Sequence, residues 1–316
     1  EPPYGEIAAQ PDHRKLVHGI EILPDGSLIF VFDGGISLQR IAKCSQRIWN
    51  IHGILHHAVT MDARGESIWT LADAGDFVNV AVADGKVLRK IETEDIITAN
   101  PDIDILELRR NHSSELGENS RNTKGDWLRD NAGNWKGVFL HYNDVDPLHP
   151  ALADSFPMAA AGDLLISSRS LNLVFIVDPA TLKIKWWRVG AGQRQHDPDW
   201  QPDGRITIFD NRMSRDYSQI VALDPVSFER EILFDGRRND FYTRIRGKHQ
   251  VLDDGTLVVS SSQQGRAFEV APDGDIVFEL INTKPGSDAY NYTVTELRWL
   301  PPDFFDVEDW SCPETN

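Results

Sequence analysis

The sequence has little cysteine, little positive charge and no long apolar run. Only two of its 316 residues are cysteine, and 32 lysine and arginine residues stand against 49 aspartate and glutamate residues, a net charge of −17. Nucleic acid and anionic membrane surfaces both attract clustered lysine and arginine, so we predict neither as a partner. No run of about 18 apolar residues occurs, so the sequence predicts no membrane-spanning helix.

The two cysteines lie near opposite ends of the chain, at Cys44 and Cys312. Sequence does not give the distance between them, so a disulfide and two free thiols both stay open. The chain begins with Glu1 rather than methionine. A removed signal peptide or a membrane anchor before Glu1 also stays open as an expectation.

What the sequence does contain is a repeat built on glycine turns. The turn anchors are LPDG (Gly26), DARG (Gly65), AAGD (Gly162), QPDG (Gly204), LDDG (Gly255) and a degenerate LPPD that ends at Asp303. A β-rich strand such as RITIFDN follows the anchors, and most units add a second hairpin, as in VFIVDPATLKIKWWRV. Four strands per unit are typical of a propeller blade.

Six anchors therefore predict an all-β, six-bladed β-propeller that forms a single domain over residues 1–316. The last unit has one clear strand, so we expect the N-terminal segment to complete its blade and close the ring. Residues 93 to about 138 break the repeat and are rich in polar residues and glycine. We predict an insertion between blades that caps one mouth of the channel and offers a surface for a protein partner. Residues 149–161 are expected to lengthen the first hairpin of the third blade.

Several histidines share one register relative to the repeat. His18, His57 and His196 each lie eight residues before a turn glycine, and His141 opens the corresponding strand of the third unit. In an antiparallel hairpin, a residue eight before the turn glycine lies near one seven after it. This spacing places Arg169 opposite His141 and Asn211 opposite His196.

The innermost strand of each blade lines the channel, and its first residue lies at one mouth. The expected ring consists of His18, His57, His141, His196, Arg169, Asn211 and Asp33. The basic segment RRNDFYTRIRGKH, with Tyr242 and Arg244, is expected at the same mouth. Arginine and imidazolium groups donate hydrogen bonds to anions, so we predict an anionic ligand. One such histidine alone would be typical of a structural residue, and it is the shared register that favours a site.

Clustered histidines also bind zinc or copper. A positive Arg169 in the ring argues against a cation, so we expect neither a metal nor another cofactor. Asp33, Asp197 and Asp210 keep a calcium-dependent site open as a weaker alternative.

Five motifs occur in a fixed order: HHAV, LHYNDVDPL, LLISSRSLNLVFIVDP, QRQHDPDWQPDGRITIFDN and FYTRIRGKHQVLDDG. With them the chain resembles the bacterial arylsulfotransferases that do not use a nucleotide donor, from about residue 16 to 305, and in particular their short branch. The resemblance implies a six-bladed propeller in the periplasm or at the cell exterior. It also implies ping-pong transfer of a sulfuryl group from an aryl sulfate to a phenol, without a cofactor.

The resemblance also assigns roles to residues. His196 of QHDP matches the histidine that takes the sulfuryl group, His141 and Arg169 match residues that hold the sulfate oxygens, and His57 matches a further active-site histidine. Asn143 belongs to the LHYN motif, and we group it with Asn211, Tyr242 and Arg244 as substrate-binding candidates. A neutral imidazole can attack sulfur. Arg169 and a protonated His141 would stabilise the sulfuryl oxygens, and His57 or His141 would exchange the phenol proton.

The chain departs from this family in two respects. We expect the chain to lack the N-terminal β-sandwich of the long enzymes, and the 93–138 insertion changes the spacing before LHYN. Two other functions stay open. One is a non-catalytic propeller that binds a partner protein or an anionic ligand at the mouth, and the other is a histidine-based lyase or hydrolase.

Overall fold

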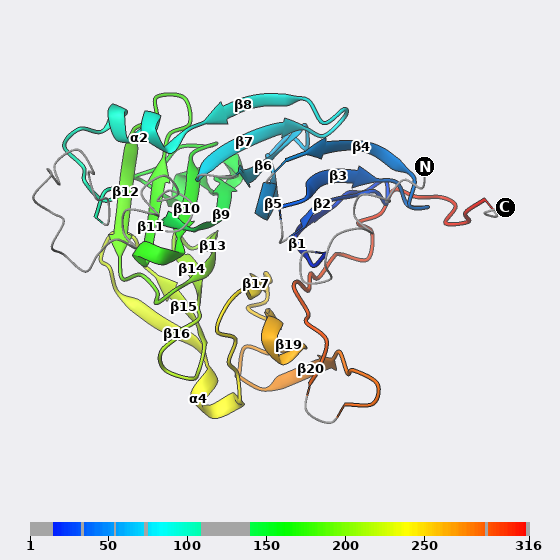
Figure 1. Cartoon of the computed structure of the whole chain (residues 1–316). Helices are drawn as coiled ribbons and strands as arrows, with labels where there is room; N and C mark the ends of the chain where they lie inside the picture. Colours follow the sequence, from blue (N-terminus) through cyan, green and yellow to red (C-terminus); the bar gives the residue numbers. More distant parts are fainter. Residues whose placement is uncertain are drawn as a thin grey trace, which may run out of the picture.

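The computed structural model describes residues 15–32, 35–53, 55–72, 75–108, 140–287 and 290–313 (Figure 1). These residues form five antiparallel sheets of four strands each, and in every sheet the strands pair in chain order. Figure 1 shows the first strand of each sheet near a common centre and the fourth strand at the periphery. The fold is therefore an all-β propeller, as the repeat predicts.

The strand bounds follow the repeat. Blade 1 comprises β1 (Val17–Ile22), β2 (Leu28–Phe32), β3 (Ser37–Ile41) and β4 (Arg47–His52). Blade 2 comprises β5 (Leu55–Met61), β6 (Ser67–Ala72), β7 (Asp76–Ala81) and β8 (Val87–Ile91). Blade 3 comprises β9 (Tyr142–Pro147), β10 (Leu164–Ser168), β11 (Leu173–Val177) and β12 (Ile184–Val189). Blade 4 comprises β13 (His196–Trp200), β14 (Ile206–Asp210), β15 (Gln219–Leu223) and β16 (Arg230–Asp235). Blade 5 comprises β17 (Lys248–Val251), β18 (Leu257–Ser261), β19 (Arg266–Val270) and β20 (Ile276–Ile281).

Short helices lie between the strands. They are α2 (Thr93–Ala99), the 3₁₀ helices η5 (Pro150–Ser155), η6 (Arg169–Leu171) and η7 (Ser262–Gln264), and α4 (Gly236–Asn239). None of the helices described is long and apolar enough to cross a membrane.

The five unambiguous turn anchors lie where the repeat places them, between the first and second strands of the blades. Their glycines, Gly26, Gly65, Gly162, Gly204 and Gly255, all have φ between +69° and +86°. Side chains other than glycine rarely adopt this left-handed conformation, which explains the recurring glycine.

The prediction of six blades is wrong for the described residues, which form five. After β20 the described chain makes one isolated bridge, Thr283 to Asn291, and residues 292–313 contain no strand. The sixth anchor holds consecutive prolines, Pro301 and Pro302, which cannot donate the hydrogen bonds of a sheet. The N-terminal strand expected to complete the sixth blade falls at residues 1–14, outside the described residues.

Residues 296–312, which we call the C-terminal strap, connect blade 5 to blade 1 instead. At blade 5 the Trp299 amide donates to Gln250 Oε1 at 3.0 Å, and at blade 1 the Asp306 amide donates to the Pro24 carbonyl at 2.8 Å. Cys312 forms a disulfide with Cys44, across a sequence separation of 268 residues. The pairing that the sequence leaves open is therefore present.

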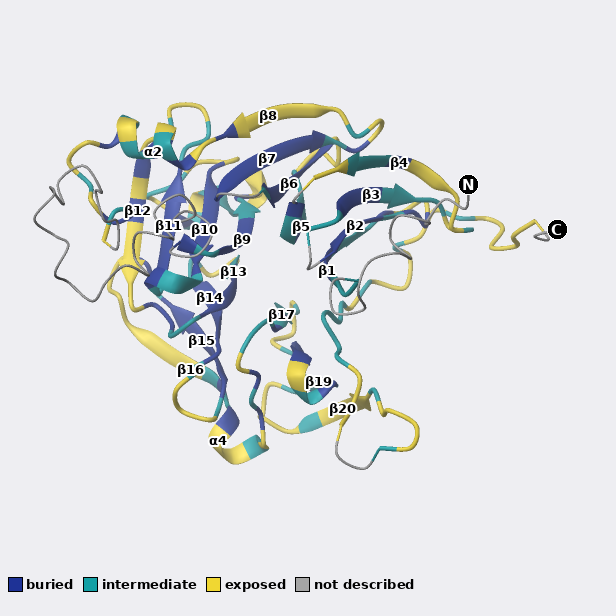
Figure 2. Ribbon diagram, viewed as in Figure 1, coloured by how far each residue is buried: buried dark blue, intermediate teal, exposed yellow. Residues whose placement is uncertain are grey.

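The apolar core lies between neighbouring blades. Figure 2 shows that middle strands of the blades, such as β7 and β15, are largely buried, whereas outer strands, such as β8 and β16, are largely exposed. One cluster, with Phe77, Phe175 and Tyr142, fills the space between blades 2 and 3, and α2 adds Ile96 to it. Residues 93–108 therefore pack on the propeller. Residues 109–138 of the insertion lie outside the described residues, and its capping role stays a prediction.

Candidate functional site

A β-bulge recurs at the candidate histidines. The first strands of blades 1 to 4 each shift register near the expected ring position, between Val17 and Ile20, between His56 and Val59, around Asn143, and between His196 and Asp199. Such a bulge re-aims the side chains beside it. Left-handed backbone accompanies it, with φ of 65° at His57 and 45° at His141. This left-handed conformation is uncommon for residues other than glycine and is often found at functional sites.

Rings from three blades form one contiguous group. The ring centroids of His18 and His57 lie 4.9 Å apart, those of His57 and His141 lie 5.3 Å apart, and His56 contacts His57 at 4.7 Å. The Nδ1 atoms of His56 and His57 are 2.6 Å apart, so one of the two carries the shared proton. The shared register thus brings residues far apart in sequence into one cluster. Asp33, the further ring candidate, lies outside the described residues.

Arg169 lies against His141, as the register predicts. Arg169 Nη1 donates to His141 Nε2 at 2.9 Å, and the Arg169 amide donates to the His141 carbonyl at 3.1 Å. Because Nε2 accepts this bond, His141 is neutral in this arrangement, which differs from the protonated His141 that the resemblance favours. Burial lowers the pKa of Arg169, and the neighbouring charges of Arg194 and Arg244 lower it further. Three guanidinium groups in electrostatic contact favour an anion beside them.

Asn211 fixes the proton of His196. Asn211 Nδ2 donates to the Thr243 and Arg246 carbonyls at 2.9 and 2.7 Å, so its Oδ1 is the acceptor for His196 Nδ1 at 2.7 Å. His196 therefore carries its proton on Nδ1 and a lone pair on Nε2. The Arg246 backbone N–H donates to this lone pair at 3.2 Å. The second contact predicted from the register, His196 with Asn211, is confirmed.

Burial keeps two histidines neutral. It lowers the pKa of His196 well below its usual value; the bond to Asn211 opposes the shift, and Arg169, His18 and His141 add to it. Burial also lowers the pKa of His57 well below its usual value, and the neighbouring histidines add to that shift. Both imidazoles are therefore uncharged at pH 7, each with one protonated and one unprotonated ring nitrogen.

We expect His196 to remain neutral well below pH 6.5, the usual midpoint for histidine. Desolvation and the nearby Arg169 both penalise the charged ring, so the folded protein holds the neutral form at pH values where a free imidazole is protonated. A pH titration of the ¹⁵N-histidine-labelled protein by NMR checks this, with His196→Asn to assign the signal. The histidine signals that persist in His196→Asn serve as the internal control. A His196 midpoint at or above 6.5 would contradict the assignment.

The remaining candidates have different surroundings. Asn143 is buried and donates from Nδ2 to the Gln195 carbonyl at 2.8 Å, while its Oδ1 has no hydrogen-bond partner among the described residues. The Tyr242 hydroxyl donates to the Met213 carbonyl at 3.0 Å. Arg244 is exposed, and its amide donates to Gln263 Oε1 at 2.8 Å. Asn143 therefore holds the residue before His196, and Asn211 orients His196 itself.

Three contributors were not found from the sequence. His56 adjoins His57 in the HHAV motif, and Arg194 precedes His196 by two residues in QRQH, so both carried a local signal. Arg194 also has left-handed backbone, with φ of 58°. The Arg246 amide carried no signal in the sequence, because every residue except proline has a backbone N–H. Only the fold decides which N–H lies against His196.

The fold and the cluster define a class of protein, a β-propeller whose innermost strands and adjoining loops bring histidines and arginines to one centre. Residues 19–283 match the arylsulfotransferase (ASST) family, and the chain belongs to that family. No curated protein sequence matches it.

Two solved structures resemble the propeller. A protein of unknown function from Bacteroides caccae is 13% identical, with 84% of this chain and 81% of that chain covered, at a TM-score of 0.52. A luciferin-regenerating enzyme is 10% identical, with 85% and 78% covered, at a TM-score of 0.51. Identities this low support the fold alone.

Proposed function

We propose that this protein transfers a sulfuryl group from an aryl sulfate to a phenol through a sulfated His196. The observation that carries the proposal is the state of His196, a neutral imidazole with its proton held on Nδ1 by Asn211 and a lone pair on Nε2. Membership of the arylsulfotransferase family supports the same reaction.

In the first half-reaction the Nε2 lone pair forms a bond to sulfur while the bond from sulfur to the aryl oxygen breaks. The bonding pair leaves with the phenolate. Arg169, with Arg194 and Arg244 in electrostatic contact, would stabilise the three sulfuryl oxygens as charge develops on them. The Nδ1 proton stays on His196 and keeps its bond to Asn211.

In the second half-reaction the acceptor oxygen attacks sulfur, and the nitrogen–sulfur bond returns its electron pair to Nε2. The acceptor proton needs a base, and His57 is available as one because burial lowers the pKa of its ring and keeps the ring neutral at pH 7. For the same reason His57 holds no extra proton at pH 7 that it could give to the first phenolate. We therefore expect good donors to be sulfate esters of acidic phenols, whose phenolates leave without being protonated.

One contact must open before the donor reaches His196. The ring is 3% exposed, and the Arg246 N–H occupies the lone pair that attacks sulfur. Arg246 has φ of 63° and adjoins Gly247, so the contact is in the loop before β17. We propose that this loop withdraws when the donor binds.

The direct test exposes the protein to an activated aryl sulfate without acceptor and measures its intact mass. Gain of one sulfuryl group by the native chain, and none by His196→Ala, is the expected result. Release of no phenol and no gain of mass would instead favour the second candidate, a propeller that binds an anion at the same cluster without transfer. The contact between His196 and the Arg246 amide is the observation that favours this candidate.

Arg169→Ala is expected to lower kcat/KM for the aryl sulfate by about 10²- to 10³-fold, because one charge-stabilising donor is lost. Arg169→Lys should restore activity only in part, since an ammonium lacks the forked geometry of a guanidinium. Arg89→Ala, at an exposed position on outer strand β8, is the matched control. Steady-state kinetics with a chromogenic donor measures all three. Equal activity of Arg169→Ala and the control would remove Arg169 from the site.

We also propose an oxidising compartment, the periplasm or cell exterior, for this protein. The disulfide between Cys44 and Cys312 supports this, because structural disulfides are typical of such compartments.

A further inference from the structure

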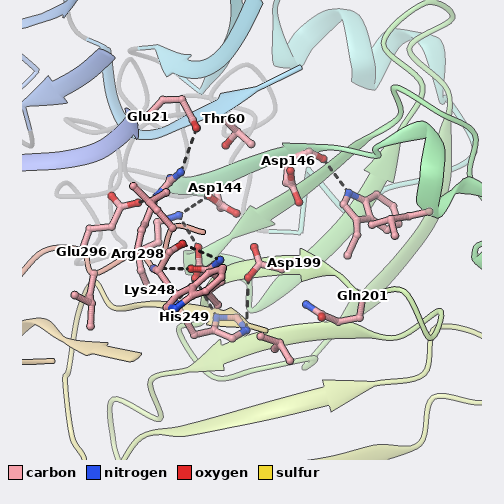
Figure 3. A pocket seen from close by; sticks show the side chains of 18 of the residues that line it. Glu21, Thr60, Asp144, Asp146, Asp199, Gln201, Lys248, His249, Glu296 and Arg298 are labelled. Carbon is pink, nitrogen blue, oxygen red and sulfur yellow. Dashed lines mark hydrogen bonds and ion pairs between the residues drawn. The ribbon is translucent and has the colours of Figure 1, made fainter. Parts of the chain in front are cut away.

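A second cluster of ionisable groups lies outside the histidine cluster. A cavity of about 430 Å³ opens between β13, β17 and the C-terminal strap (Figure 3). Carboxylates outnumber lysine and arginine on its wall. The carboxylates are Glu21, Asp144, Asp146, Asp197, Asp199 and Glu296, and the cations are Lys248 and Arg298.

Both cations form ion pairs with carboxylates of this wall. Lys248 Nζ lies 2.6 Å from Asp197 Oδ1 and 3.1 Å from Asp144 Oδ1. Arg298 pairs with Glu296 at 2.6 Å and with Glu21 at 3.3 Å. Asp146 and Asp199 have no lysine or arginine partner in the part of the chain that the structure describes. The wall is therefore short of positive charge on the Asp199 side.

His249 on β17 presents its Nε2 to this acidic wall. Its Nδ1 lies 3.0 Å from Asp197 Oδ2, which also accepts the His249 amide at 2.6 Å. A carboxylate accepts and does not donate, so Nδ1 carries a proton and Nε2 is the ring nitrogen left for another group. The side chain is fully buried, and Nε2 has no hydrogen-bond partner among the described residues.

Asp199 Oδ2 lies 3.6 Å from that nitrogen. This distance exceeds that of a hydrogen bond. Two donors bound to one tetrahedral zinc ion at about 2.0–2.1 Å lie about 3.4 Å apart, which is close to the spacing seen here. A carboxylate that holds the far nitrogen of the histidine, as Asp197 does, is the usual support of a metal-binding histidine.

We infer that Asp199 and His249, with Asp197 orienting His249, bind a divalent transition-metal ion such as Zn²⁺ or Mn²⁺. An imidazole nitrogen with carboxylate oxygen favours these ions over Ca²⁺ and Mg²⁺, which take oxygen ligands. Asp146 lines the same cavity. The positive charge of Arg169 disfavours a cation in the histidine ring, and Asp199 and His249 lie outside that ring.

The inferred ion would join two blades. Asp197 and Asp199 belong to β13 of blade 4, and His249 belongs to β17 of blade 5. Lys248, also on β17, is neutralised by two carboxylates and adds no net repulsion to the site. Because the unfolded chain lacks this geometry, the ion would bind the folded state and stabilise it by mass action.

The test starts with protein stripped by a chelator and then saturated with Zn²⁺, Mn²⁺, Ca²⁺ or Mg²⁺ in separate samples. We expect one Zn²⁺ or Mn²⁺ per chain after gel filtration, by elemental analysis, and a rise in Tm of roughly 5 °C or more at a hundredfold excess over Kd. Co²⁺ as a probe should give the visible absorption of a tetrahedral complex with nitrogen and oxygen ligands.

Asp199→Asn is the principal variant, because its side chain is 29% exposed and the substitution keeps the shape. It should lose metal and the gain in Tm, as should His249→Gln. Asp273→Asn, at an exposed turn, should keep both. A native chain that takes up no transition metal, that binds only Ca²⁺ or Mg²⁺, or that loses nothing on Asp199→Asn overturns the site. Sulfuryl labelling of His196 is measured in a separate experiment. The metal result therefore does not decide the proposed transfer, and the labelling result does not decide the metal site.

Discussion

Replacing His196 with alanine is expected to abolish covalent capture of the sulfuryl group and to lower kcat for transfer by about 10³-fold or more. A ping-pong reaction cannot proceed without its nucleophile, and removal of a nucleophile costs several orders of magnitude in well-studied enzymes. The mass of the intact protein and turnover of a chromogenic aryl sulfate measure the two effects. Free imidazole added to His196→Ala should restore release of phenol without adding mass to the protein.

Asn211 gives a finer test of the same chemistry. Asn211→Ala removes the acceptor that holds the His196 proton on Nδ1, so the lone pair is no longer confined to Nε2. We expect labelling to slow by about 10²-fold, since loss of the correct tautomer is costly in catalytic histidines. His52→Ala, at an exposed position on β4, should label at the native rate. Full sulfuryl labelling of His196→Ala would show that another residue is the nucleophile and would refute the assignment of His196.

Loss of the disulfide is expected to lower the free energy of unfolding by about 2–5 kcal/mol. The bond joins Cys44, in the turn between β3 and β4, to the end of the C-terminal strap, across a sequence separation of 268 residues. A link across so long a loop removes much conformational freedom from the unfolded chain. Urea unfolding of Cys44→Ser/Cys312→Ser against the native protein measures the difference.

A reductant provides the control for this variant. It should bring the native protein down to the stability of the double variant and should leave the double variant unchanged. Hydrogen exchange should also quicken in β1 and β17, the strands that the strap connects, and not in β10 and β11 of blade 3. Equal stability of the oxidised and reduced protein would show that the strap holds without its covalent link.

The local features of this chain were predictable from its sequence, and the contacts between distant segments were not. The hairpin turns were predictable because each needs a glycine at positive φ, as at Gly204. Antiparallel pairing fixes which residues face each other near such a turn, and the predicted contacts of His141 with Arg169 and of His196 with Asn211 followed from that rule. The His196 contact needed only the spacing within one hairpin, and the His141 contact also needed the alignment of its strand with those of the other units.

The number of blades was not predictable in the same way. The motif at Asp303 resembles a turn anchor, but the described chain around it forms no strand and crosses from blade 5 to blade 1. Whether such a segment pairs as a strand depends on the neighbours that the closed ring offers. Its consecutive prolines were the local sign against a strand.

The sequence by itself determined the repeat, the all-β fold, the histidine register and the family. Each of these rests on residue types at fixed spacings along one stretch of chain. Only the tertiary structure decided that there are five blades, that Cys44 reaches Cys312, that the Arg246 amide covers His196, and that His249 meets Asp199. Those contacts join different blades or distant segments, and their distances are set by how the sheets pack around the centre rather than by local spacing.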